Sequence, residues 1–468
     1  MKKLFLALLM LLASNLTHAQ NDTYKQAVAA FVENYNAGQY SKIFDAFSEE
    51  MQTFLPADRT VTVLSGLKTQ FGNIAGTELI DFKNGNMASY KATFEKGVLQ
   101  LNLSVNESTR IRGIEFKPYV AEQVNYDHVV NALSGINKQQ ADLIFEHVKT
   151  FPGNTQLAFA FVENGKPAYY GIIKENDTVK FTTNSQKVFE IGSITKVFTA
   201  TLLADLIVQK KLKPEDEVNR YFSFPFNNNT RLSFESLANH TSGLPRMPAN
   251  FEASVDNQAN PYKNYDANNL HAYLKDELTL SNTGKKTYAY SNLGSGLLGY
   301  SLGLAQKSDY RDMLQKRVFK KYNMRNTFTD RTAAAGKLVT GLDKDGKPTS
   351  NWDMSVFAGA GAILSTTEDM ATFMTAHFKP SDKVLALTRK PTFVVDEKME
   401  VGLGWHIIKM KSGQSLHWHN GGTGGYTSSM ILDASQQKGV VILSNVSAFH
   451  PDMQQIDNLC FGLINTLP

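Results

Sequence analysis

The segment FEIGSITKVFTA, residues 189–200, places a serine, Ser193, three positions before a lysine, Lys196. If this segment is helical, residues three apart lie on one face with Cβ atoms about 5–6 Å apart, so the hydroxyl and the amine can meet. A lysine accepts a proton only when it is neutral, which requires burial or a nearby cation to lower its pKa. The two residues are therefore a candidate nucleophile and its base.

The residues that follow this pair favour the same chemistry. The stretch VFTATLLADLIV is apolar on nearly every side, which predicts a central buried helix whose N-terminal dipole favours negative charge on the serine oxygen. The simpler alternative is that Ser193 only caps this helix. Ser-x-x-Lys also occurs at Ser65/Lys68 and Ser435/Lys438, but Ser435 falls in a predicted turn and Ser65 in a segment without recognisable partner residues.

A second candidate segment is TYAYSNLGSGLLGY, residues 287–300. The phenol of Tyr290 has an ordinary pKa of about 10 and can exchange protons with a nearby lysine. The amide of Asn292 can hold a substrate carbonyl or orient a lysine. The alternative is that Tyr290 only packs in the core and that Ser291 or Asn292 caps a helix.

A third candidate segment is HWHNGGTGGYTSSM, residues 417–430. His417 and His419 lie on one face of a predicted strand, but no carboxylate or third histidine follows at a ligand spacing, so we expect no metal. Gly421 and Gly422 allow the backbone to come close to a ligand and to point N–H groups at an oxyanion. A flexible hairpin is the alternative.

Together, the motifs resemble a known superfamily. SITK, YSN and HNG occur in this order, accompanied by LANHTSGLP (237–245), AGAGAILSTTEDMATFM (358–374) and GLGWHI (402–407). This set resembles the serine β-lactamase and penicillin-binding-protein superfamily, in its class C β-lactamase-like branch of D-aminopeptidases, carboxypeptidases and esterases. The resemblance spans roughly residues 125–468.

The resemblance implies a role for each motif. Ser193 would be the acylated nucleophile, Lys196 its base partner and Tyr290 a second proton shuttle that helps deacylation. Asn292 would contact the substrate and the Lys196 amine.

The third motif departs from the lactamase pattern. His419 stands where lactamases often carry lysine, so the pocket would lack a permanent cation. The N–H groups of Ser193 and Gly422 would form the oxyanion hole, with Gly421 beside them. We therefore expect ester or D-amino-acid amide substrates at least as much as β-lactams or acyl-D-Ala peptides. A non-catalytic relative that binds penicillin or peptidoglycan is the alternative function.

The N-terminal part predicts a small α+β domain over residues 20–120. Residues 24–38, 40–51 and 62–72 have helical patterns, and residues 98–105 alternate apolar and polar side chains as a strand does. This domain loosely resembles accessory domains that precede secreted hydrolases, so we expect a spacer or a binding module.

Residues 121–468 predict the hydrolase domain, of mixed α/β (α+β) class. Asn164-Gly165 between two apolar runs predicts a hairpin before Ser193, and strands return after residue 400. Strands at both ends with helices between them predict one antiparallel sheet flanked by helices, with an inserted helical region.

Residues 1–19 predict a signal peptide, because MKK precedes the apolar run LFLALLMLLA and small residues precede a cleavage position after Ala19. We expect a periplasmic or secreted protein with no stable membrane span after cleavage. Loss of Lys2 and Lys3 lowers the formal net charge from +4 to +2, too little to indicate nucleic acid. The single cysteine, Cys460, is expected in the core and cannot form an internal disulfide. We also expect no cofactor, and a small molecule or a peptide as the substrate.

Overall fold

The computed structural model describes residues 23–83, 87–106, 108–119, 126–280 and 286–468. The predicted signal peptide, residues 1–19, lies outside them. The chain divides into two compact units, Met1–Val124 and Asn125–Pro468. Among the described residues, no helix combines the length and the apolar character needed to cross a membrane.

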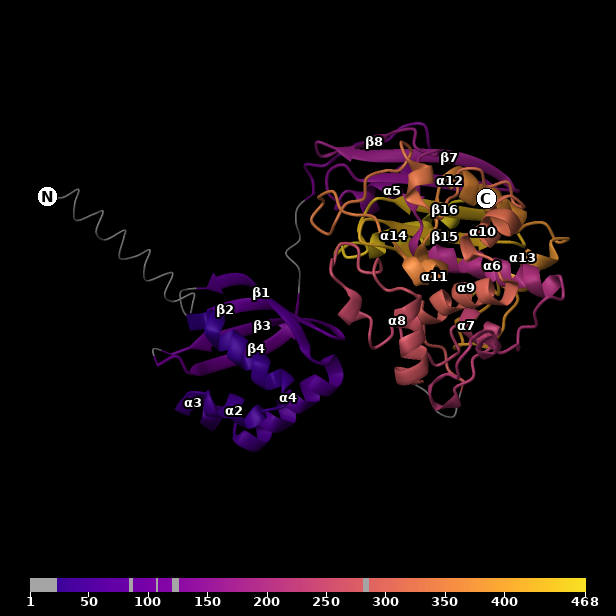
Figure 1. Ribbon diagram of the computed structural model, residues 1–468. Coiled ribbons are helices and arrows are strands. Elements are labelled where there is room, and N and C mark those ends of the chain that lie inside the picture. The colour runs from indigo at the N-terminus through magenta and orange to yellow at the C-terminus, as the bar shows by residue number, and fades with distance from the viewer. Residues whose placement is uncertain (1–22, 84–86, 107, 120–125, 281–285) are drawn as a thin grey trace. The chain divides into compact units, whose positions relative to one another are not determined.

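The first unit packs helices on one face of an antiparallel meander (Figure 1). Leu99, Leu101 and Leu103 alternate along one strand and are buried, and Val105 is partly buried, as the sequence pattern predicted. The helix predicted over 40–51 is two helices, because Ser48 accepts a hydrogen bond from the Met51 N–H and starts a new helix there. The elements are a helix over 23–36, α2 (Tyr40–Asp45), α3 (Glu49–Phe54), α4 (Ala57–Phe71), β1 (Ile74–Lys83), β2 (Met87–Phe94), β3 (Gly97–Val105) and β4 (Ile111–Pro118).

The second unit is built on a ten-stranded sheet that joins both ends of the unit, as predicted. Val441 of one terminal strand lies opposite Ala160 of the other in an antiparallel ladder. Asn164 and Gly165 both have positive φ, as the tight hairpin between β6 and β7 requires. In sheet order the strands are β11 (Phe393–Val394), β12 (Met399–Val401), β13 (His406–Lys409), β14 (Ser415–Gly422), β15 (Thr427–Asp433), β16 (Lys438–Ser444), β6 (Gln156–Glu163), β7 (Lys166–Glu175), β8 (Thr178–Phe181) and β5 (Val130–Ala132), with β5 parallel to β8.

Helices cover both faces of this sheet, so the central strands are buried on both sides. Along β16, Val440 and Ile442 belong to one core with α5 (Lys138–Val148) and α14 (Gln454–Ile464), whereas Val441 and Leu443 belong to the core on the opposite face. Figure 1 shows α5 and α14 on one side and α6, α9 and α11 on the other. Cys460 lies buried in α14, as predicted, and is free.

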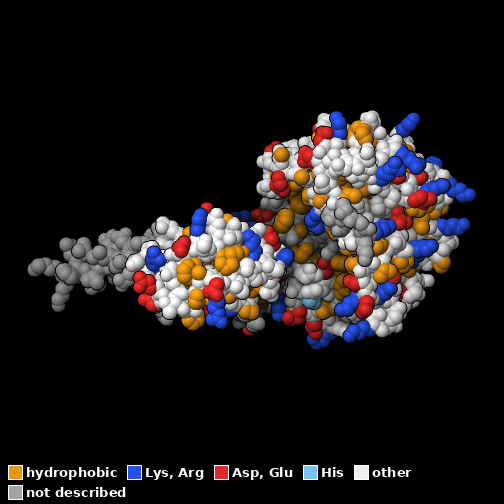
Figure 2. Space-filling view, turned by 90° about the horizontal axis from the view of Figure 1, so that it is seen from below, with side chains coloured by type: hydrophobic (Ala, Val, Ile, Leu, Met, Phe, Trp, Pro, Cys, Tyr) orange, Lys and Arg blue, Asp and Glu red, His pale blue; other side chains and the backbone are white. Residues whose placement is uncertain are grey.

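The inserted helical region surrounds α6 (Thr195–Val208), which is buried along nearly its whole length, as predicted. The strand β9 (Phe189–Glu190) pairs with β10 (Leu364–Ser365) and leads into α6 through a 3-10 turn over Gly192–Ile194. The other helices are α7 (Phe234–Ala238), α8 (Ala267–Ala272), α9 (Asn292–Gln306), α10 (Tyr310–Leu314), α11 (Ala358–Gly361), α12 (Thr367–Ala376) and α13 (Lys383–Arg389). Figure 2 shows acidic and basic side chains interspersed on the face in view.

Candidate active site

Ser193 lies in the 3-10 turn that begins α6, and it does not cap that helix. The residue at the cap position is Ile194, which makes no side-chain capping bond. The Ser193 hydroxyl is instead joined to Lys196 Nζ at 2.8 Å. The structural alternative, in which the serine serves only as a cap, is therefore not observed.

Lys196 is buried in the first turn of α6, with only 3% of its surface exposed. Besides the Ser193 hydroxyl, its Nζ donates to the Ala360 carbonyl at 2.9 Å. Burial, and secondarily the positive charge of Arg246, holds the pKa of Lys196 well below its usual range. Among the described residues no carboxylate forms an ion pair with this amine. The neutral amine that a general base requires is thus favoured.

Tyr290 faces the same pair from the segment before α9. Lys196 Nζ lies 4.9 Å from the centre of its ring, and its hydroxyl is hydrogen-bonded with Ser193. Burial raises the pKa of Tyr290 to about 12, against smaller opposing effects of the Ser193 hydrogen bond and the Arg246 charge. Ser291 next to it is the helix cap, accepting from the Gly294 N–H, so one residue of YSN caps and another reaches the serine.

His419 lies in the middle of β14 and is buried. Its Nδ1 is 2.6 Å from the Asn420 carbonyl oxygen, which can only accept, so Nδ1 carries the proton. Its Nε2 has no hydrogen-bond partner among the described residues. Burial, with the nearby His406 and Lys196, holds the pKa of His419 well below its usual value, so the ring is neutral at pH 7.

Gly421 and Gly422 bring β14 directly against the turn that carries Ser193. A Cβ atom on Gly192 would lie 2.5 Å from the Gly422 nitrogen, and Gly192 has a φ of +49°. The Ser428 hydroxyl also donates to the Ile191 carbonyl at 2.8 Å and fastens the neighbouring strand to this turn. Two backbone segments thus meet at the nucleophile with no side chain between them.

We expect Gly192→Ala to lower the free energy of unfolding by about 1–3 kcal/mol, because it adds a side chain at positive φ and against backbone. The rate of Ser193 acylation should fall with it, since the turn must shift. Chemical denaturation and probe labelling measure the two effects. Gly153→Ala is the matched control, since a Cβ atom there meets nothing within 4 Å; equal behaviour of the two variants would contradict the tight contact.

Among the described residues, Lys196 Nζ donates to Ser193 and to the Ala360 carbonyl and not to Asn292, which differs from the expectation from the motif. The side-chain nitrogen of Asn292 lies 4.0 Å from the Met247 sulfur and its amide is hydrogen-bonded with Tyr262. The physical reason is the cap: Ser291 occupies the cap position, so Asn292 begins α9 and points to the loop that carries Met247. Asn292 is half-buried, so part of its side chain is open to contact with a substrate.

Sequence reasoning missed Arg246, which lies directly after the LANHTSGLP motif. Its guanidinium carbon is 5.4 Å from the centre of the Tyr290 ring. The expectation that the pocket lacks a permanent cation is thereby corrected, because Arg246 supplies the charge that His419 does not. Adjacency to the motif was the only sequence signal.

His240 and His406 were also missed. His240 accepts from the Ser291 N–H at 3.2 Å, and its ring centre is 4.5 Å from that of Tyr290. His406 contacts the Tyr288 hydroxyl at 2.7 Å. Burial lowers the pKa of both rings, to about 4 for His406. Both rings are neutral, and they pack against Tyr290 and His419. Among the described residues, no group of three or more His, Cys, Asp or Glu side chains could hold a metal ion.

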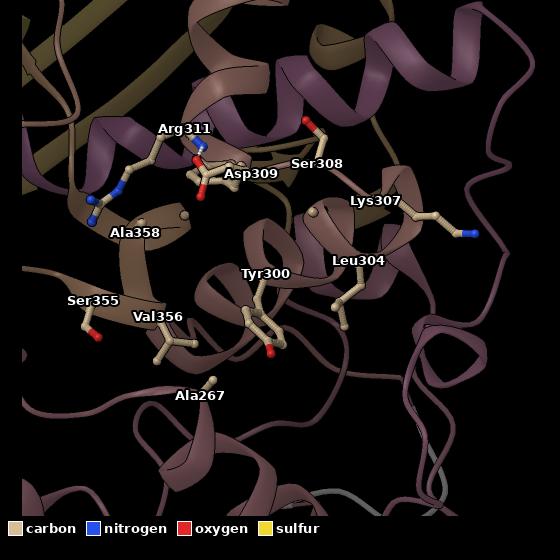
Figure 3. Close-up of a pocket in the computed structure, with 13 residues that line it drawn as sticks. Ala267, Tyr300, Leu304, Lys307, Ser308, Asp309, Arg311, Ser355, Val356 and Ala358 are labelled. Carbon is tan, nitrogen blue, oxygen red and sulfur yellow. Dashed lines mark hydrogen bonds between the residues drawn. The ribbon is translucent and has the colours of Figure 1, made fainter.

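A separate cavity of about 570 Å³ lies along the C-terminal half of α9, where Figure 3 shows Tyr300, Leu304 and Val356 around it. Neither Ser193 nor Lys196 lines this cavity. A much smaller space of about 10 Å³ lies beside His419 and is also bordered by His240 and His406, but Ser193, Lys196 and Tyr290 do not line it.

Fold and site together define a class of protein, the serine hydrolases in which the nucleophile precedes a buried helix whose first turn carries a lysine. A family model described as Beta-lactamase matches residues 144–459, more than half of the 468 residues. The chain therefore belongs to the β-lactamase family, whose members are serine hydrolases. A second model, described as Protein of unknown function (DUF3887), matches residues 28–114 of the first unit.

Individual relatives are distant. A beta-lactamase of Pseudomonas fluorescens is 25% identical in an alignment of 340 residues that covers 64% of this chain and 90% of that protein. Protein flp of Staphylococcus aureus is 25% identical in an alignment of 337 residues that covers 68% of this chain but only 64% of flp. The class C beta-lactamase of Rhodobacter sphaeroides superposes with a TM-score of 0.59 at 20% identity, covering 70% of this chain and 99% of that one, and so shares the fold.

Proposed function

We propose that this chain is an exported serine hydrolase that cleaves an ester or amide through an acyl-enzyme on Ser193. The observation that carries the proposal is the 2.8 Å contact between Ser193 Oγ and the buried Nζ of Lys196. The pKa of Lys196 is lowered, whereas the pKa of Tyr290 is raised to about 12. Lys196 is therefore the base that accepts the first proton from Ser193, and Tyr290 is not. Export is inferred from residues 1–19.

The first half of the reaction forms the acyl-enzyme. Neutral Lys196 removes the hydroxyl proton as Ser193 Oγ bonds to the substrate carbonyl carbon, and the carbonyl oxygen becomes an oxyanion facing the N–H groups of Ser193 and Gly422. Tyr290 then gives its proton to the leaving amine or alcohol as the bond to the carbonyl breaks. The protonated Lys196 returns its proton to Tyr290, which holds protons more tightly.

The second half returns the free enzyme. Water attacks the acyl carbon and gives up a proton to neutral Lys196, and the ester bond to Ser193 Oγ breaks as Lys196 returns that proton to the serine oxygen, which releases the acid product. Asn292 and His419 would contact the acyl group, with Gly421 beside them. The neutral His419 favours esters and D-amino-acid amides over substrates that need a cation at this position.

The test uses the mature protein, a serine-reactive fluorophosphonate and a fluorescent penicillin, with intact mass and peptide mapping as the readout. We expect the fluorophosphonate to add one equivalent at Ser193, with turnover of a p-nitrophenyl ester or D-Ala p-nitroanilide. Nitrocefin is the β-lactam arm of the same panel. Absence of added mass at Ser193 from both probes would overturn the proposal. A stable penicillin adduct without turnover of any substrate would instead identify a non-catalytic binding relative.

A further inference from the structure

We propose that the cavity along the C-terminal half of α9 is an effector site. It binds a small molecule with an apolar body and one carboxylate, and its occupation speeds acylation of Ser193. The site is separate from the reactive groups, because neither Ser193 nor Lys196 lines it. Binding in the cavity is independent of the proposed function, whereas the effect on acylation rests on it.

The cavity has the size and the walls of a small-molecule site. Its volume of about 570 Å³ falls within the range of roughly 300–1,000 Å³ in which proteins bind small ligands. Tyr300 and Leu304 of α9 line it together with Val356 (Figure 3), and all three side chains are only partly buried. A ligand with a hydrocarbon or aromatic body would therefore remove apolar surface from water.

Two exposed cations, Lys307 and Arg311, border the cavity, and among the described residues neither forms an ion pair. Asp309, which also lines it, is engaged as the cap of α10, whose N–H groups it accepts. The charge of Arg311 lowers the pKa of Asp330, but that carboxylate accepts its hydrogen bonds from Thr332. The edge of the apolar space therefore carries an excess of positive charge, which favours an anion.

Arg311 is the cation that we expect to hold the carboxylate. Figure 3 shows its side chain on the side of the cavity that carries Ser355, whereas the side chain of Lys307 extends away on the opposite side. A guanidinium can bind both oxygens of a carboxylate, and Ser355 adds a hydroxyl donor on the same side.

One wall of the cavity also supports Lys196. Ala358 and Gly359 of α11 line the cavity, and the next residue, Ala360, accepts the hydrogen bond from Lys196 Nζ at 2.9 Å. Ser355, at the start of the same segment, has a φ of +40°, a backbone conformation that costs energy for a residue other than glycine. A short, strained segment thus contacts the cavity at one end and positions the base at the other.

A second connection runs through Tyr310, which lines the cavity. Its hydroxyl lies 2.6 Å from Thr199 Oγ1, and Thr199 donates to the Gly359 carbonyl at 2.7 Å. Since Thr199 lies three residues after Lys196 in α6, hydrogen bonds join α6, α10 and α11 at the cavity wall.

Occupation of the cavity should favour the arrangement that positions Lys196. A ligand stabilises the state that it binds best, and the cavity is present in the state in which Ser193 and Lys196 are in contact at 2.8 Å. A molecule in the cavity opposes movement of α11 into that space and so keeps the Ala360 carbonyl at the amine. We expect acylation at least about fivefold faster, the lower end of the usual coupling between two sites.

Calorimetric titration of the mature protein with 5-phenylpentanoate and 5-phenylpentanamide tests the binding, because the two compounds share one apolar body and differ in charge. We expect both to bind, the carboxylate at least about fivefold more tightly. Arg311→Gln should bring the two affinities together. Arg220→Gln is the control, since it removes an exposed arginine whose ion pair with Asp216 is 3.7 Å long. Failure of both compounds to bind, or equal affinities in the wild-type protein, would overturn the proposal.

Two substitutions that fill the cavity locate the bound compound. Leu304→Trp and Val356→Trp each add an indole at a partly exposed position of the wall, and each should weaken binding at least about tenfold. Val394→Trp is the matched control, since Val394 is 59% exposed on β11, away from the cavity. Circular dichroism checks the fold of each variant. Binding that survives both cavity substitutions would place the compound elsewhere and contradict the assignment.

The rate of Ser193 labelling by the fluorophosphonate, with and without saturating 5-phenylpentanoate, tests the effect on acylation. The compound should raise this rate at least about fivefold in the wild type and in Val394→Trp, but not in Val356→Trp. An unchanged rate would overturn the effector role, and so would slower labelling that persists in Val356→Trp, which indicates competition at the serine. If Ser193 is never labelled while the compound still binds in the cavity, the proposed reaction fails and the binding site stands.

Discussion

Ser193→Ala should abolish covalent labelling and lower kcat/KM on the best substrate by about 10⁴-fold or more, the order of magnitude seen when an enzyme loses its nucleophile. Alanine removes only the hydroxyl oxygen that lies 2.8 Å from Lys196 Nζ. The fold should be unaffected, because Ser193 is not the cap of α6. Intact mass after fluorophosphonate treatment and steady-state kinetics measure the two effects, and circular dichroism checks the fold.

Two further serines provide controls with the same spacing to a lysine. Ser65 lies within α4 of the first unit, so Ser65→Ala changes a residue of a different domain. Ser435→Ala removes a hydroxyl that is hydrogen-bonded to Asp433 in the turn between β15 and β16. Neither change should affect labelling. If Ser193→Ala still gained one equivalent of probe, or if Ser435→Ala abolished labelling, the assignment of the nucleophile would be wrong.

Lys196→Met should slow acylation at least about a hundredfold, the usual size for loss of a positioned proton acceptor. Loss of the amine should also change how kcat/KM depends on pH. The amine accepts a proton only when neutral, so wild-type kcat/KM should rise with pH through the lowered pKa of Lys196, and this rising limb should be absent from the variant. Kinetics of acylation from acid to mild alkaline pH measure it, with Lys438→Met as the control that keeps the limb.

The same variant should be more stable than the wild-type protein near neutral pH. Burial lowers the pKa of Lys196 in the folded state, so the unfolded chain binds a proton more tightly than the folded one. The free energy of unfolding of the wild type therefore rises with pH from the folded pKa towards about 10.4, the unfolded value. The advantage of Lys196→Met should shrink over that window, and denaturant titrations at several pH values would show it. A variant that is both fully active and less stable would contradict the role of Lys196.

Local patterns were sufficient to predict the reactive pair and much of the sheet. Ser193 and Lys196 meet because the i, i+3 spacing of a helix brings them together, and no distant contact is needed. Asn164-Gly165 predicted the β6–β7 hairpin because its turn requires two residues at positive φ. The short edge strand β5 (Val130–Ala132) was not predicted, since three exposed residues carry no alternation and pair only through backbone.

The rest of the site depends on contacts between distant segments. Arg246 reaches Tyr290 only because its carbonyl bonds to the start of α9, which no periodicity in the chain indicates. The role of Asn292 was predicted from motif order alone. That order does not show that Ser291 is the cap of α9 or that the Asn292 side chain contacts Met247. Motif spacing thus predicted which segments meet, while hydrogen bonds of the loops decide which side chain of each segment faces the serine.

The direct backbone contact between Gly192 and Gly422 limits how this site can diverge. With no side chain in the gap, any larger residue at position 192 must shift the turn that carries the nucleophile away from β14, at a cost in stability. Selectivity in descendants or engineered versions must therefore change through the surrounding side chains at positions 246, 292 and 419. A mutational library aimed at new substrates is best confined to those positions, with both glycines held constant.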